Sequence, residues 1–99
     1  MSYFYISQKV EAIARERDKI CVYCRKEFIK KGEREHIIND AKLNGEDNIA
    51  ICCGSCNRSK SNKTLQKWFE MPYCKRNNIN YDTVAPVVKA VLDKLKFRN

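Results

Sequence analysis

The sequence predicts a single small α+β domain in which a β-hairpin lies between two pairs of cysteines and is flanked by helices. The pairs are Cys21/Cys24 and Cys53/Cys56, and the segment between them has the composition of short strands and turns. Apolar residues recur at helical spacing near both ends of the chain. A chain of 99 residues, of which 43% are hydrophobic, is expected to form one domain (residues 1–99) that gains from a cross-link.

The first predicted element is a helix from about residue 7 to residue 18, which would brace the hairpin. One face of this helix contains Val10, Ile13, Ala14 and Arg17. Ser7 is suited to the N-cap because its hydroxyl can accept a hydrogen bond from a free backbone N–H of the first turn.

Two β-prone segments, 34–38 and 48–52, are predicted to pair as an antiparallel hairpin. Their connection includes Asn44-Gly45-Glu46-Asp47, a composition typical of turns. A helix is expected from about residue 54 to residue 62, beginning within the second cysteine pair. Thr64 then opens another turn or helix with Leu65, Trp68 and Phe69, and Trp68 is expected in the core.

A final helix is predicted from about residue 82 to residue 97, capped by Asp82 or Thr83, with Pro86 in its first turn. Its apolar stripe consists of Val84, Val87, Val88, Val91, Leu92 and Leu95. We expect this stripe to pack in the core, with a dimer seam as the alternative.

The four paired cysteines predict a structural zinc site. Thiolates suit Zn²⁺, and a short Cys-x-x-Cys turn brings both sulfurs to one ion. The 28 residues between the pairs leave room for the hairpin. Cys52 and Cys74 lie outside this spacing and are expected to be small buried hydrophobic residues, with a reactive thiol as the alternative for Cys74.

The cysteines and the apolar segments also bear on the compartment. Disulfides would be the alternative to zinc in an exported protein, but residues 3–6 are too short and lack the basic flank of a signal sequence. No apolar stretch reaches the length of a membrane span. We therefore expect a cytoplasmic protein with reduced cysteines.

The charge distribution is compatible with a polyanionic partner. The net charge is +8, and residues 55–99 contain ten Lys/Arg against three Asp/Glu, whereas residues 1–54 contain ten against nine. A basic half of this kind attracts nucleic acid. A solvated surface that aids solubility is the alternative explanation.

The one histidine of the chain indicates a second centre. His36 follows Glu35 directly, and Asn57 follows the second cysteine pair. Because four thiolates complete a tetrahedral zinc site, a histidine beside an acid is not needed there. A neutral imidazole can accept a proton near pH 7, and carboxylate and amide oxygens suit Mg²⁺ or Mn²⁺. The structural alternatives are an exposed acid, a structural histidine and an asparagine at a helix start.

Four segments, in this order along the chain, resemble HNH endonucleases of the zinc-containing ββα-metal class. They are Cys21-Val-Tyr-Cys24, Glu35-His36-Ile-Ile, Asn48-Ile-Ala-Ile-Cys-Cys53 and Gly-Ser-Cys56-Asn57-Arg-Ser-Lys60-Ser-Asn-Lys63. The resemblance covers about residues 19–69 and implies a zinc-stapled ββα core, in which a two-stranded hairpin and the following helix hold a catalytic metal. The chain departs from the family where Asn39 replaces a common proline. The short distance from Cys24 to Glu35 leaves little room for further DNA-contacting structure there.

The resemblance implies a role for each residue of the second centre. His36 would be the general base that activates water, and Glu35 and Asn57 would bind the catalytic Mg²⁺ or Mn²⁺. Asn48 would steady the loop that aims the histidine. The chemistry implied is hydrolysis of a phosphodiester bond, in which the metal neutralises charge and assists the departing 3′ oxygen.

Three basic residues in and just after the metal-binding helix are predicted to contact phosphates: Arg58, Lys60 and Lys63. The sequence therefore predicts a metal-dependent DNA endonuclease. The alternatives are a zinc-stabilised nucleic-acid-binding module that does not cut, and an adaptor that uses its C-terminal helix. A double-strand break would require a homodimer or two binding events.

Overall fold

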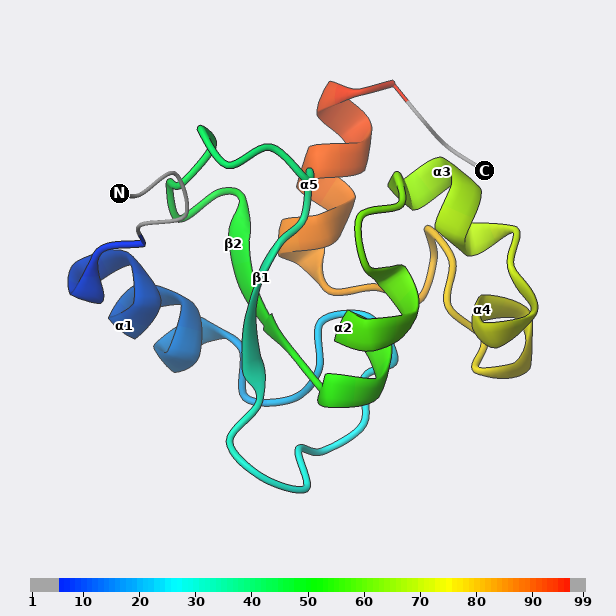
Figure 1. Ribbon diagram of the computed structural model, residues 1–99, viewed down its shortest axis with the longest axis horizontal. Helices are drawn as coiled ribbons and strands as arrows, with labels where there is room; N and C mark the ends of the chain where they lie inside the picture. Colours follow the sequence, from blue (N-terminus) through cyan, green and yellow to red (C-terminus); the bar gives the residue numbers. More distant parts are fainter. Residues whose placement is uncertain (1–5, 97–99) are drawn as a thin grey trace.

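The computed structural model describes residues 6–96 as a small α+β structure (Figure 1). In this part of the chain, one two-stranded antiparallel sheet is combined with five helices. The elements in chain order are α1 (Gln8–Arg17), β1 (Glu33–His36), β2 (Ile49–Cys52), α2 (Gly54–Lys60), α3 (Leu65–Phe69), α4 (Pro72–Arg76) and α5 (Pro86–Lys94). The hairpin lies between α1 on one side and α2 on the other (Figure 1).

The predicted hairpin is confirmed. β1 and β2 are antiparallel, with Glu33 opposite Cys52 and His36 opposite Ile49. All four residues of β2 are buried, whereas β1 is mostly exposed or half-buried. β2 therefore lies at the centre of the structure, and β1 lies at its edge with Glu33 and Arg34 exposed.

The predicted N-terminal helix is also confirmed, and it braces β2. Ser7 caps α1, and its Oγ accepts a hydrogen bond from the backbone N–H of Val10 at 3.1 Å. Ala14 is buried in a small cluster with Ile49 and Ile51. At the end of the helix, Asp18 Oδ2 accepts from the backbone N–H of Ile51 at 3.1 Å, which fixes the helix to the strand.

The segment after β2 forms the second half of the core. A helix begins after Thr64 as predicted, and Thr64 caps it through a hydrogen bond from the N–H of Lys67 to its Oγ1. Trp68 is fully buried, and its ring meets that of Tyr23 edge-on at 5.0 Å between centroids. The Trp68 indole N–H donates to Ser59 Oγ at 2.9 Å, which joins α3 to α2.

The start predicted for the last helix is wrong, since α5 begins at Pro86 and its N-cap is Ala85. Thr83 is used in a preceding turn, where its Oγ1 accepts from the N–H of Asn80. The N–H of Ala85 donates to the carbonyl of Val22 at 2.9 Å, so this extended residue is held against the segment that contains the first cysteine pair.

The apolar stripe of α5 mostly packs in the core as expected. Val88, Val91 and Leu92 are buried, but Leu95 is 54% exposed because the helix ends before it, at Lys94. The predicted end at residue 97 lies outside the described residues. α4 was not predicted, although Pro72 at its first position is a signal for a helix start. No helix in residues 6–96 has the length and apolar character needed to cross a membrane.

Candidate metal centre and polar site

The four paired cysteines come together in one cluster. Their sulfur atoms all lie within 4.8 Å of one another, and Cys24 Sγ lies 3.9 Å from Cys53 Sγ. Tetrahedral zinc with bonds near 2.3 Å requires sulfurs about 3.8 Å apart. Cys21 and Cys56 are fully buried, and the other two are half-buried. The cluster could therefore hold a metal ion such as zinc.

Local backbone geometry explains how each pair faces the same point. In the first pair, the N–H groups of Tyr23 and Cys24 point at Cys21 Sγ, at 3.4 and 3.5 Å. In the second pair, the N–H of Cys56 points at Cys53 Sγ at 3.4 Å, and Cys53 thereby caps α2. Such N–H groups favour thiolate over thiol, which is the form that binds metal.

Tyr73 provides a further contact that the sequence did not indicate. Its hydroxyl lies 3.4 Å from Cys56 Sγ, and it reaches the cluster from α4. The unpredicted helix α4 thus contacts the cysteine cluster. Partners of this kind around ligating groups tune metal sites.

The pKa values within the cluster indicate how metal binding depends on pH. A hydrogen bond from Cys56 lowers the pKa of Cys21 to about 4, and the same bond raises the pKa of Cys56. Burial raises the pKa of Cys24 to about 11. A metal that takes four thiolates must release the protons of Cys24 and Cys56, so affinity should rise with pH.

Cys52 and Cys74 are fully buried and lie outside the cluster, as predicted. Burial raises the pKa of Cys74 to about 12 and raises that of Cys52 above its ordinary range. Both thiols therefore stay protonated near neutral pH and act as small hydrophobic side chains.

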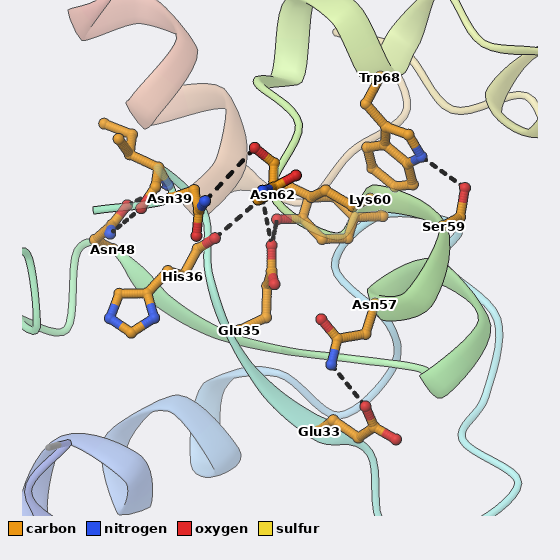
Figure 2. Close-up of polar contacts among 12 residues, drawn as sticks. Glu33, Glu35, His36, Asn39, Asn48, Asn57, Ser59, Lys60, Asn62 and Trp68 are labelled. Atoms are coloured by element: carbon orange, nitrogen blue, oxygen red, sulfur yellow. Dashed lines mark hydrogen bonds and ion pairs between the residues drawn. The ribbon is translucent and has the colours of Figure 1, made fainter. Parts of the chain in front are cut away.

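Glu35 is held in a buried polar cluster on the face of β1 that meets α2 (Figure 2). Its Oε2 accepts from Lys60 Nζ at 2.7 Å and from the Tyr23 hydroxyl at 2.9 Å. Lys60 and Tyr23 are fully buried, and Glu35 is 7% exposed. Burial, and then the charge of Glu35, raise the pKa of Tyr23, which keeps the phenol protonated as a donor.

Lys60 does not occupy the position predicted for a phosphate contact. It follows Cys56 by one helical turn, so both side chains point inward from α2. Its ammonium also donates to the carbonyl of His36 at 3.1 Å. A buried ammonium requires a counter-charge, and Glu35 supplies it. The prediction that Lys60 binds DNA is therefore corrected, because no part of this side chain is available to a phosphate.

Asn57 contacts Glu33 and not Glu35, the acid with which it was expected to bind a metal. Its Nδ2 donates to Glu33 Oε1 at 2.6 Å, and Glu33 is exposed (Figure 2). Glu33 and Glu35 lie on the same face of β1 because strand side chains alternate. Glu33 was not among the predicted site residues, although its position two residues before Glu35 was the available signal.

His36 lies on the opposite face of β1. The neighbour with which it shares that face, Arg34, pairs with Glu11 of α1 at 3.5 Å. Figure 2 shows the His36 ring pointing away from Asn57. The structure thus brings Asn57 to Glu33 on the acidic face of β1. It does not bring His36 to that face, because consecutive residues of a strand face opposite sides.

The His36 ring is oriented by the connection between the strands. Its Nε2 lies 2.7 Å from Asn44 Oδ1. Because an amide oxygen accepts hydrogen bonds only, a neutral ring carries its proton on Nε2 and presents Nδ1 as the basic nitrogen. The imidazole is half-buried.

Asn48 holds the connection between β1 and β2 together through its side chain. Its Oδ1 accepts from the N–H of Ile38 at 2.8 Å, while its Nδ2 donates to the carbonyls of Ile38 and Leu43 at 3.1 and 3.0 Å. The side chain is buried at the point where the connection rejoins β2. Asn48 therefore fixes both ends of the loop that contains Asn44.

The two remaining basic residues differ in availability. Arg58 is exposed and lines a groove of about 870 Å³ beside the cysteine cluster. Lys63 is half-buried, and its Nζ donates to the carbonyl of Ser59 at 3.0 Å. Of the three predicted phosphate contacts, Arg58 has the most open position.

Comparison of the chain with protein-family models, with curated proteins and with solved structures gave no match. The resemblance to HNH endonucleases depends on the four sequence segments alone.

Proposed function

We propose that this protein is a metal-dependent DNA endonuclease that hydrolyses phosphodiester bonds at the junction of β1 and α2. The observation that supports this most is the contact of Asn57, on the helix that directly follows the hairpin, with the acidic face of β1. A hairpin followed by a helix, with an acid and an amide at their junction, offers hard oxygen ligands to a divalent cation.

The possible ligands of such a cation differ in how readily they could bind it. Glu33 and Asn57 are already in contact and lie at the surface, so they would hold Mg²⁺ or Mn²⁺ without rearrangement of the core. Glu35 would join them only if its carboxylate left Lys60 or used its second oxygen. When bound, the cation supplies charge neutralisation at the phosphate and at the departing 3′ oxygen.

His36 is the proposed general base. Asn44 fixes the ring so that Nδ1 can accept a proton from water. Within residues 6–96, β1 pairs with β2 alone, so its other edge is unpaired. A DNA strand that crosses this edge would contact the acidic face on one side and the imidazole on the other. Asn48 would serve the reaction indirectly, as a positioning residue for the loop that orients His36.

A second candidate function is a nucleic-acid-binding module that is held by zinc and does not cut. It is favoured by the Lys60–Glu35 pair, which already neutralises one of the proposed metal ligands, and by the position of His36 on the other face. Both functions predict DNA binding, so only a cleavage assay separates them.

The test uses the zinc-loaded protein with supercoiled plasmid and either Mg²⁺ or Mn²⁺. We expect nicked or linear product from the native protein and a loss of at least about a hundredfold in His36→Ala, the usual contribution of a general base. Gln66→Ala, an exposed amide on α3, is the control for surface substitution. Absence of cleavage with either metal would support the binding module, and equal cleavage by His36→Ala would remove His36 as the base.

A further inference from the structure

The segment 25–32 joins the first cysteine pair to β1 and projects beyond the end of the hairpin (Figure 1, cyan). It contains four basic residues and one acid: Arg25, Lys26, Lys30, Lys31 and Glu27. Ile29, near its tip, is 98% exposed. The segment thus presents an apolar side chain from a basic loop.

Contacts on both sides of Ile29 hold the segment in place. Phe28 is half-buried and packs against the hydrophobic core. Arg15 of α1 donates to the carbonyl of Lys31 at 2.9 Å. Gly32 has a φ of +79°, and a Cβ there would lie 2.7 Å from the side chain of Ile51. The exposure of Ile29 is therefore a property of an anchored loop.

This exposure stands out from that of other apolar residues. Single exposed hydrophobic residues are common and need no explanation by themselves. Among the large hydrophobic residues in the described part of the chain, however, Leu95 comes next at 54%. Ile29 also differs in its position next to Lys30 and Lys31.

The loop forms one wall of the groove of about 870 Å³ that Arg58 also lines. Lys30 and Lys31 belong to the loop, Arg58 belongs to α2, and Glu33 lies where the groove meets β1. Since Glu33 accepts from Asn57, the groove leads from the exposed isoleucine to the proposed cleavage site. Basic side chains on both sides favour a polyanion as its occupant.

We propose that the segment 25–32 is a DNA wedge: Ile29 inserts between adjacent base pairs from the minor groove of duplex DNA, while Lys30, Lys31 and Arg58 contact the flanking phosphates. The inference rests on the proposed function and adds to it the form of the substrate and the way it is held. Apolar side chains that enter the minor groove partly unstack a base step and bend the duplex. A protein partner is disfavoured because lysines are depleted in the apolar centres of protein interfaces.

The wedge explains how a short connection can contact DNA. The sequence left little room for such structure between Cys24 and Glu35, but an anchored tip needs only one apolar residue and its basic neighbours. Phosphate contacts position a protein without reading bases, so this arrangement favours flexible steps rather than a defined sequence.

The test uses zinc-loaded protein without added divalent metal, so that binding is observed without cleavage. The probe is a 20-base-pair duplex with one 2-aminopurine and with fluorophores at its ends. We expect the native protein to increase 2-aminopurine fluorescence, which reports unstacking, and to shorten the end-to-end distance. Ile29→Ser should lose both signals and bind about tenfold more weakly, since an isoleucine is no longer buried on binding. Ile29 is almost fully exposed, so its replacement leaves the fold intact.

Three comparisons complete the experiment. Ile29→Leu should retain both signals, and Leu95→Ser, the control for loss of an exposed apolar residue, should behave as the native protein. Lys30→Ala with Lys31→Ala should lower the salt dependence of binding by about two phosphate contacts. Unchanged unstacking and bending in Ile29→Ser, or binding by the native protein without either signal, would overturn the wedge and leave the endonuclease proposal standing. Failure of the native protein to bind duplex DNA would overturn both.

Discussion

Two polar sites are built on the same hairpin and the same helix α2, and they differ in what holds them. The cysteine cluster is formed by two short turns, each of which brings two sulfurs together through its own backbone. The acidic face of β1 is formed by pairs that are distant in sequence: Glu35 with Lys60, and Glu33 with Asn57. The first site depends on local geometry and the second on packing.

This difference divides the residues of the second site into two groups. Glu35, Lys60 and Tyr23 are buried and satisfy one another, so they contribute to the stability of the fold. Glu33 is exposed and Asn57 is half-buried, and their contact lies at the surface, where it can be exchanged at low cost. The exposed pair is therefore better suited to bind a cation, and the buried group to support it.

The largest expected effect on zinc binding and on folding comes from replacing a cysteine of the cluster. Cys56→Ser should bind little zinc and lose its cooperative unfolding transition, because zinc binding contributes about 10–16 kcal/mol to small sites of this kind. Cys74→Ala, another fully buried cysteine, should retain the metal and lose only about 1 kcal/mol. Metal analysis and thermal unfolding by circular dichroism measure both. A zinc-free native protein that unfolds cooperatively would contradict a structural role for the metal.

The next effect concerns the buried ion pair. Lys60→Met should lower the free energy of unfolding by about 3–5 kcal/mol, because it leaves Glu35 buried without a counter-charge. Adding Glu35→Gln to it should restore much of this loss. Lys94→Met removes an exposed pair with Asp47 and should cost less than about 1 kcal/mol. Urea unfolding of the zinc-loaded variants tests the contrast, and equal losses in the two lysine variants would refute it.

A smaller effect on the free energy of unfolding is expected from Tyr23 at alkaline pH. Because burial raises the pKa of Tyr23 in the folded protein, the unfolded chain loses this proton first, near the ordinary value of about 10. The stability from this tyrosine is present below that pH and is lost as pH rises above it. Tyr23→Phe should lose about 1.5–3 kcal/mol at pH 8 and show a shallower decline above pH 10. Tyr81→Phe, which removes a hydroxyl that bonds Asp93 at an exposed site, is the matched variant for loss of a tyrosine hydroxyl.

The same contrast explains what the sequence could predict. The cysteine cluster, the hairpin, the cap at Ser7 and the start of α3 at Thr64 depend on spacing or local hydrogen bonds, which are visible in the sequence. The start of α5 was mispredicted because Ala85 is fixed by a hydrogen bond to Val22, a contact made only in the folded chain.

The arrangement of the second site was less accessible to sequence reasoning. The alternation of strand side chains could have separated His36 from Glu35, and the helical repeat could have placed Lys60 on the buried side with Cys56. Neither pattern reveals that Lys60 would pair with Glu35, because that depends on how α2 packs on β1. A family resemblance identifies residue types and their order along the chain. It does not specify which side chains contact one another in the folded protein.

The smallest expected effect on stability is at the exposed pair. Asn57→Ala and Glu33→Gln should each change the free energy of unfolding by no more than about 0.5 kcal/mol, because their contact lies at the surface. Urea unfolding provides the measurement. A loss above about 2 kcal/mol in either variant would place the pair among the structural contacts and remove the division between the two groups.

Plasmid cleavage by Asn57→Ala tests the central claim most directly. The assay compares the native protein, Asn57→Ala and the Gln66→Ala control, all zinc-loaded and shown to be folded, on supercoiled plasmid across a range of Mg²⁺ and Mn²⁺ concentrations. We predict that the native protein and the control nick the plasmid and that Asn57→Ala loses at least about a hundredfold in rate while its stability is unchanged. Cleavage by Asn57→Ala at the native rate, or no cleavage by the native protein with either metal, would contradict the proposal.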